Sequence, residues 1–191
     1  EQLAGGFLIV GVLLFILFRD IMRYKPVYIK NYNMLLLLCL MLVSTLLIAR
    51  LFNFLLLSLS KGSGFIPIEG VIFGMPLPAG AMLITLLFDF HTAIIFSFTV
   101  SILTGLWLHN AAFTIYAFVG SLTAAFSVIR CKKRSALLWG GLYVLGVNVI
   151  TVIILSLFEG KLLTAEALSS MAFAAFAGIT VLAIVSMLLP L

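Results

Sequence analysis

Polar side chains inside or beside long apolar stretches are the residues of this sequence best suited to binding chemistry. A guanidinium or an amide at bilayer depth is costly unless it is paired, so each one marks a candidate site. The candidates for the outer half of a helical bundle are Arg50, Asn53, Glu69, His109, Asn110 and Asn148. They predict a polar pocket that opens outward, in which Glu69 or the His109 region pairs with Arg50. Asn53 follows Arg50 by three residues, which predicts that the two share a helix face.

The alternative for this group is purely structural. In that case the long side chain of Arg50 extends to the membrane interface, and the Asn148 amide bonds a neighbouring backbone group. Both interpretations remain open from the sequence alone.

A second polar group is expected at the inner ends of the helices. It consists of Asp89, His91, Arg130 and Arg134. Asp89 directly follows an apolar run, so it could cap the next helix or pair with the basic residues of 130–134. The alternative is a signalling contact that relays a conformational change on the inner face.

Motifs of catalysis are missing from the sequence. It contains no HExxH, GxSxG, GxGD, GxGxxG or P-loop pattern and no His–Asp dipeptide. With two histidines in 191 residues, a dinuclear metal site is out of reach. We therefore expect no catalytic residues, no metal and no other cofactor in this chain.

Composition places the polar candidates in a membrane protein. Hydrophobic residues make up 64% of the chain, charged residues 9%, and mean hydropathy is +1.34. In soluble domains about half of the residues are apolar and about a quarter are charged. Seven apolar runs fit membrane-spanning helices of about 20 residues. They cover residues 3–18, 34–57, 71–88, 92–108, 111–129, 136–158 and 168–189. The expected fold is a single all-α domain over residues 1–191, a polytopic bundle of seven transmembrane helices.

Lysine and arginine predict the orientation of that bundle. Loops 19–33, 89–91 and 130–135 hold eight basic residues, whereas the other set of loops holds Lys61 and Lys161. The positive-inside rule therefore predicts an outside N-terminus and a cytoplasmic C-terminus. The net charge of +5 belongs to these juxtamembrane loops, so the expected partner is the lipid bilayer and not nucleic acid.

Segment 61–78 should interrupt the third crossing. It contains four glycines and three prolines, so it cannot form one regular helix, and the third run should be helical only from Pro76 or Pro78 onward. Two interpretations are open for it: a plain surface loop, or a re-entrant cap over the outer pocket.

Small residues at four-residue spacing predict the packing faces of three helices, because close helix contact in lipid requires small side chains. The stripes are Ser97/Ser101/Gly105, Ala117/Ser121/Ala125 and Ser170/Ala174/Gly178. They fit packing within one chain, or contacts in a homodimer.

Several features together resemble one family, the seven-transmembrane receptors with an intracellular HD hydrolase. They are the run from Pro78 to Ile84 (PAGAMLI) that leads to Asp89, the basic loop from Arg130 to Ser135 followed by a glycine-rich helix with Asn148, the late Arg50, and the closing Leu188 to Pro190. The resemblance covers almost the whole chain.

This resemblance implies a multi-pass protein of the bacterial cytoplasmic membrane. The chain, which begins with Glu1, would be a fragment, preceded by an extracytoplasmic domain and followed by an HD domain that hydrolyses cyclic di-AMP with two divalent metals. Its role would be that of a sensor and anchor that responds to an unknown small molecule or lipid. The alternatives are a transporter or substrate-binding membrane subunit, and a passive anchor.

Overall fold

The computed structural model describes residues 2–24, 32–63, 67–129, 134–162 and 164–188. Their regular structure is helical, without a strand in these ranges, which confirms the all-α prediction. The helices are α1 (Gln2–Tyr24), α3 (Tyr32–Ser63), α4 (Ile68–Val71), the 3₁₀ helix η1 (Ile72–Gly74), α5 (Pro78–Leu87), α6 (Phe90–Leu108), α7 (Ala111–Val128), α8 (Arg134–Phe158) and α9 (Ala165–Leu188).

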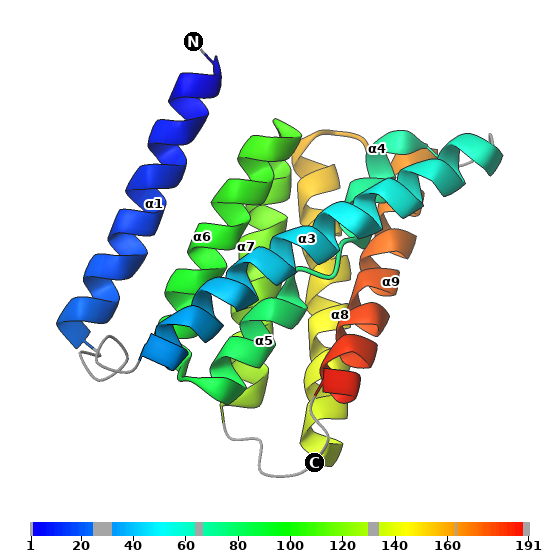
Figure 1. Cartoon of the computed structure of the whole chain (residues 1–191). Helices are drawn as coiled ribbons and strands as arrows, with labels where there is room; N and C mark the ends of the chain where they lie inside the picture. Colours follow the sequence, from blue (N-terminus) through cyan, green and yellow to red (C-terminus); the bar gives the residue numbers. More distant parts are fainter. Residues whose placement is uncertain (1, 25–31, 64–66, 130–133, 163, 189–191) are drawn as a thin grey trace.

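Helices α6 to α9 form a row in which neighbours run in opposite directions (Figure 1). Helix α5 packs on this row against α6, α7 and α9, and α3 crosses it diagonally. Helix α1 stands at the edge beside α6. The start of α1 and the end of α9 lie at opposite ends of the molecule. We call the end with α4 and the α8–α9 turn the α4 end, and the other end the Asp89 end.

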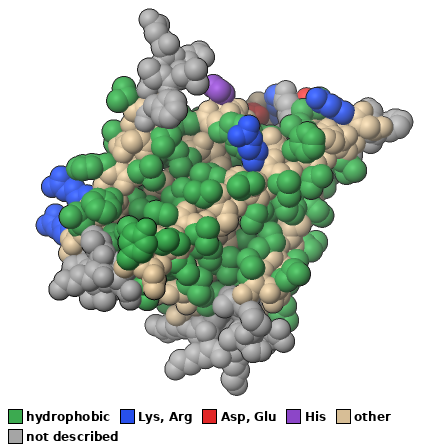
Figure 2. All heavy atoms as spheres, viewed as in Figure 1, with side chains coloured by type: hydrophobic (Ala, Val, Ile, Leu, Met, Phe, Trp, Pro, Cys, Tyr) green, Lys and Arg blue, Asp and Glu red, His purple; other side chains and the backbone are tan. Residues whose placement is uncertain are grey.

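Five of the described helices are long and apolar enough to cross a bilayer, namely α3, α6, α7, α8 and α9. The apolar segment Ile72–Leu87 is shorter than a full crossing. On the face shown in Figure 2, hydrophobic side chains cover the middle of the molecule, and the charged side chains lie toward its edges. This distribution is typical of a surface that contacts hydrocarbon.

Short turns with polar caps connect α5, α6 and α7, and a cap by Asp89 is one of the roles that the sequence predicts for it. Asp89 is the N-cap of α6, and its carboxylate accepts hydrogen bonds from the Thr92 backbone N–H (3.1 Å) and hydroxyl. His109 ends α6 in the left-handed conformation (φ 52°), and Asn110 caps α7 by accepting from the Phe113 N–H at 3.0 Å. Such caps satisfy backbone donors that the first turn of a helix leaves free.

The three small-residue stripes are buried between helices of this one chain, which confirms the intramolecular interpretation. Gly178 gives the closest example. A Cβ on Gly178 would lie 2.6 Å from the backbone Cα of Leu145, so α8 and α9 touch almost backbone to backbone. In lipid this close packing replaces the hydrophobic driving force that water would supply.

Candidate functional site

Prolines interrupt the apolar segment Ile72–Leu87 between η1 and α5. Met75 has extended backbone (φ −74°, ψ 129°), and α5 begins at Pro78, which occupies the first helical position. Proline has no backbone N–H and suits that position, where no donor is needed. The predicted helix start is thus confirmed, and the link through Met75 and Leu77 is deeply buried.

Burial of this link means that the described part of segment 61–78 is not a plain surface loop. Gly70, Val71 and every residue from Gly74 to Pro78 are buried. Irregular backbone at membrane depth is tolerated where protein covers it, and here α3, α7 and α9 provide the cover.

Tyr116 of α7 satisfies a carbonyl that the helix break leaves free. Its hydroxyl donates to the backbone carbonyl oxygen of Phe73 at 2.7 Å, and its ring meets the Phe73 ring edge-on at 5.0 Å between centroids. The Tyr116 side chain is 1% exposed. A buried carbonyl without a donor costs about 1–3 kcal/mol, so this bond ties the η1 segment to α7.

Two glycines let the α4–η1 segment fit between α9 and α3. A Cβ on Gly70 would lie 2.9 Å from the backbone nitrogen of Ser170, and one on Gly74 would lie 2.6 Å from Cδ1 of Leu56. Any larger residue would push the segment away from these helices. The segment is therefore held at three points, by α3, α7 and α9.

A cavity of about 660 Å³ opens at the α4 end beside this segment. It lies between α3, the α4–η1 segment, the start of α7, the end of α8 and the start of α9. Its lining consists of Leu57, Ile68, Ile72, Phe73, Asn110, Ala112, Val152, Leu155, Ser156, Glu159, Lys161, Glu166, Ala167 and Ser170. The volume falls within the ~300–1,000 Å³ of ordinary ligand pockets.

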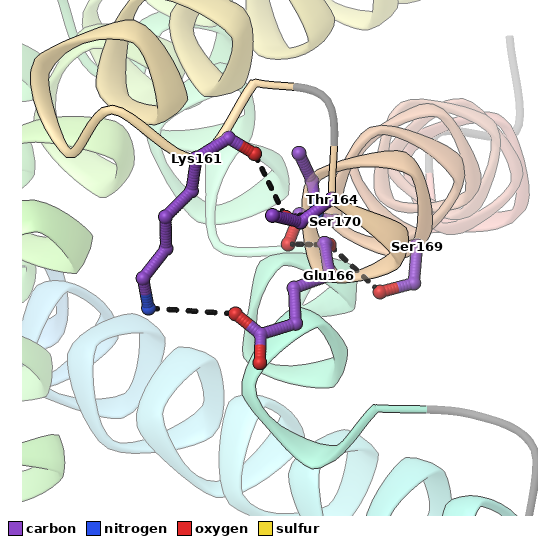
Figure 3. A network of polar contacts seen from close by, with 6 residues as sticks. Lys161, Thr164, Glu166, Ser169 and Ser170 are labelled. Carbon is purple, nitrogen blue, oxygen red and sulfur yellow. Dashed lines mark hydrogen bonds and ion pairs between the residues drawn. The ribbon is translucent and has the colours of Figure 1, made fainter.

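The polar side of this cavity is the α8–α9 turn (Figure 3). Lys161 Nζ lies 3.4 Å from Oε2 of Glu166, and both side chains are nearly half exposed. Thr164 caps α9, since its hydroxyl oxygen accepts from the Ala167 N–H and donates to the Lys161 carbonyl. The Ser169 and Ser170 hydroxyls donate to the Glu166 carbonyl. Short-range hydrogen bonds thus connect the described residues of this turn.

The structure brings only part of the predicted outer group to the cavity. Asn110 lines it. Asn53 is 8% exposed, its Oδ1 has no hydrogen-bond partner among the described residues, and it precedes the lining residue Leu57 by one helical turn. Glu69 belongs to α4 next to the lining residue Ile68, but its side chain lies outside the described part of the structure.

Arg50 and His109 lie outside the cavity lining. Arg50 is exposed, and its guanidinium carbon lies 5.9 Å from the ring centre of Trp107, a cation–π contact. Asn53, three positions further along α3, differs from Arg50 in burial, since Arg50 is exposed and Asn53 is 8% exposed. His109 is exposed as the cap of α6.

Asn148 lies inside the bundle and is not among the residues that line the cavity. It is 0% exposed, and neither amide atom has a hydrogen-bond partner among the described residues. A Cβ on Gly120 would lie 2.5 Å from Asn148 Oδ1 and 3.2 Å from Cγ of Pro78. The amide therefore packs where α7, α8 and the first residue of α5 meet.

The sequence as a whole was compared with known proteins. The family model for the 7TM receptor with intracellular HD hydrolase matches residues 1–191, the whole chain.

The chain belongs to this 7TM receptor family. The predicted family is thus confirmed, and the chain is a multi-pass membrane protein. Searches of curated proteins and of solved structures returned no match.

At the Asp89 end of this 7TM receptor region, His91 of the predicted inner group contacts a residue outside that group. His91 Nε2 lies 3.0 Å from Oδ2 of Asp20, an ion pair when His91 is protonated, and this contact joins α6 to α1. Asp89 acts as a cap, one of the two structural roles expected for it. Arg130 lies outside the described residues, and Arg134 begins α8 but its side chain is not described.

Sequence reasoning missed several residues of the receptor's cavity. Glu159, Lys161 and Glu166 sit in or next to a loop, where charged residues are ordinary. Tyr116, which lies outside the lining, was also missed, because it is one aromatic residue inside an apolar run. Its isolated hydroxyl at membrane depth was a usable signal, because a buried tyrosine usually has a hydrogen-bond partner. Among the described residues, no group of three or more His, Cys, Asp or Glu side chains could hold a metal ion.

Proposed function

We propose that this chain is the sensor and anchor module of a cyclic di-AMP phosphodiesterase in the bacterial cytoplasmic membrane. The module crosses the membrane seven times, with the start of α1 outside and the end of α9 in the cytoplasm. The alternating helix directions in Figure 1 support this arrangement. The positive-inside rule also supports it, because Arg19 and Arg23 lie near the end of α1, at the Asp89 end.

The signal enters at the cavity of the α4 end and leaves through α9. Phe73 lines the cavity, and its carbonyl is held by Tyr116. Beyond the break, α5 packs on α9 in one apolar cluster that includes Ala79, Met82, Val181 and Val185. A ligand that changes the position of Phe73 therefore acts on α5, and α5 acts on α9. The HD domain, with its two divalent metals, follows α9 and hydrolyses the second messenger.

The observation that carries this proposal is the break between η1 and α5, where the Tyr116 hydroxyl donates to the Phe73 carbonyl. A relay requires an element with two arrangements and a ligand that prefers one of them. The α4–η1 segment suits this role, because its freed carbonyl depends on a donor from another helix. A continuous helix would satisfy its own carbonyls and resist such a change.

The substitution Tyr116→Phe in the full-length receptor tests the relay. It deletes the hydroxyl and keeps the ring, so it removes about 1–3 kcal/mol from the arrangement in which Phe73 is held. We expect the basal rate of cyclic di-AMP hydrolysis to change by about fivefold or more, since ~1 kcal/mol already shifts a two-state equilibrium about fivefold. The readout is hydrolysis by the receptor in nanodiscs.

Tyr143→Phe is the matched control. Tyr143 lies on α8 with 62% of its surface exposed, so loss of its hydroxyl leaves both the break and the hydrolysis rate unchanged. If Tyr116→Phe hydrolyses cyclic di-AMP at the rate of the unmodified receptor, the module is a passive anchor and the relay is wrong.

A further inference from the structure

The cavity at the α4 end combines an apolar floor with a charged rim. Ile72, Phe73, Val152 and Leu155 form most of the floor, and the charged residues lie on the α8–α9 side. Solutes that carry both an apolar body and a polar head bury surface against such a floor and keep the head at the rim. Its volume of about 660 Å³ accommodates a solute of drug size.

The charges of the rim determine which sign of charge is favoured on the polar head of a ligand. Among the described residues that line the cavity, the charged side chains are Glu159, Lys161 and Glu166. Lys161 is paired with Glu166 at 3.4 Å. Among the residues that the structure describes, no cation lies within ion-pair distance of the Glu159 carboxylate. The rim thus carries an excess negative charge, which belongs to Glu159.

Helix starts at the cavity could favour an anion instead, because a helix N-terminus attracts negative charge. Helices α7 and α9 both begin there. Each start already has its own acceptor, since the Asn110 side chain accepts from the Phe113 N–H and the Thr164 hydroxyl accepts from the Ala167 N–H. These caps reduce the attraction for a bound anion, whereas the Glu159 carboxylate keeps its attraction for a cation.

The floor favours a cation as well. The Phe73 ring is partly exposed among the lining residues, and an ammonium group is attracted to the face of an aromatic ring. The backbone carbonyl of the same residue is the one that Tyr116 holds. A ligand that contacts the Phe73 ring is therefore in direct contact with the residue at the helix break.

We infer that this cavity binds a small amine, with its ammonium group at the Glu159 carboxylate and its apolar body against Phe73 and Leu155. The inference deepens the proposed function and rests on it in taking the cavity as the place where the signal enters. The amine would shift the α4–η1 segment through Phe73 and so reach α5.

Three probes of equal size test the chemistry of the site: phenethylamine, 2-phenylethanol and phenylacetate. They share a phenyl ring and differ in head-group charge. Binding to the full-length receptor in phosphatidylcholine nanodiscs is measured by calorimetry, with empty nanodiscs as the blank for partition into lipid. We expect phenethylamine to bind about tenfold more tightly than phenylacetate, with 2-phenylethanol between them.

The variant Glu159→Gln tests whether the Glu159 carboxylate binds the ammonium group. Because the Glu159 side chain is exposed, its replacement should leave the fold intact, and we expect phenethylamine to bind about fivefold more weakly, the upper range for an exposed ion pair. Binding of 2-phenylethanol should not change. Asp20→Asn removes the same charge at the Asp89 end and serves as the control, with no change for any probe.

A second variant, Ser156→Leu, fills the cavity without a change of charge and should abolish binding of all three probes. The inference is overturned if phenylacetate binds as tightly as phenethylamine, or if Glu159→Gln leaves phenethylamine binding unchanged. Binding is read without hydrolysis, so its failure is separate from failure of the relay. If the relay alone fails, phenethylamine still binds and Tyr116→Phe has no effect on hydrolysis. If the site alone fails, the Tyr116→Phe effect remains.

Discussion

Helices α5 and α1 differ in how much of each is covered by the rest of the protein. Every residue of α5 from Pro78 to Ile84 is buried, although α5 spans only ten residues. Helix α1 spans 23 residues, yet Leu13, Leu17 and Ile21 are its only buried positions among the side chains described. Both helices are strongly apolar.

The difference shows that apolar character alone does not determine which helices of a membrane protein are buried. A leucine side chain is solvated by lipid as well as by the interior of the bundle. Burial therefore depends on close packing and on polar contacts. In α5, Gly80 packs closely against Thr45 and Phe96, and the first residue, Pro78, packs against Gly120 of α7. In α1 a Cβ on Gly5, Gly6 or Gly11 would have no atom within 4 Å, and Asp20 pairs with His91 of α6.

The largest expected effect comes from adding a methyl group to a glycine in each helix. A Cβ on Gly80 would lie 2.5 Å from the hydroxyl oxygen of Thr45 and 3.1 Å from the Phe96 ring, whereas Gly11 has no atom within 4 Å. Thr45 cannot easily move, because it is 7% exposed and its hydroxyl donates to the Met41 carbonyl at 2.6 Å. Gly80→Ala should therefore destabilise the bundle by about 1–3 kcal/mol.

Gly11→Ala should change stability in the opposite direction. Alanine is the better helix former, so in open space it stabilises α1 by about 0.5–1 kcal/mol. Thermal unfolding of both variants in the same detergent measures the contrast. If Gly80→Ala unfolds at the temperature of the unmodified protein, α5 is not closely packed and the comparison fails.

The next largest effect on stability concerns two asparagines that differ in their hydrogen-bond partners. Asn110 caps α7 through the Phe113 N–H at 3.0 Å, whereas the amide of Asn148 has no partner among the described residues. Asn110→Ala should cost about 1 kcal/mol, the usual value of a cap. Asn148→Ala should cost less, because the loss of an unpartnered amide offsets the small void that is left.

Thermal unfolding again provides the measurement, with a shift of about 2–4 °C for each kcal/mol in a chain of this size. A larger loss for Asn148→Ala than for Asn110→Ala would contradict the expectation. It would mean that the Asn148 amide is bonded to water or to a bound solute in the membrane.

Local features of the fold could be predicted from the sequence, and contacts between distant segments could not. The caps by Asp89 and Asn110, the small-residue stripes and the start of α5 at Pro78 depend on neighbours within one or two turns. The bond from Tyr116 to Phe73 spans 43 positions, and no spacing rule reaches that far. Of the predicted outer group Asn110 lines the cavity and Arg50 does not, and the charged lining comes from Glu159, Lys161 and Glu166.

Arg50 shows why the site was harder to predict than the helices. A charge late in an apolar run has two physical solutions, a buried partner or an extension toward the interface. The structure places it on the surface over the Trp107 ring. That choice depends on the rotation of α3 about its axis, which is set by contacts with α5, α6 and the α4–η1 segment.

The smallest expected effect concerns the ion pair that attaches α1. His91 and Asp20 lie 3.0 Å apart, with side chains 46% and 20% exposed, and a pair of this exposure contributes between 0 and about 1 kcal/mol. Asp20→Asn should therefore shift the unfolding temperature of the bundle by less than about 3 °C. Its effect should appear instead in the position of α1 relative to α6.

Spin labels on α1 and α6, at the exposed positions Phe15 and Phe98, can report that position by pulsed electron paramagnetic resonance. In Asp20→Asn we expect the distribution of distances between the labels to broaden, because the contact with His91 is lost and the buried side chains of Leu13, Leu17 and Ile21 remain. An unchanged distribution would mean that these three apolar contacts suffice. In that case a helix in lipid can be positioned by fewer close contacts than α5 uses, and the contrast between the two helices would reflect function rather than the needs of packing.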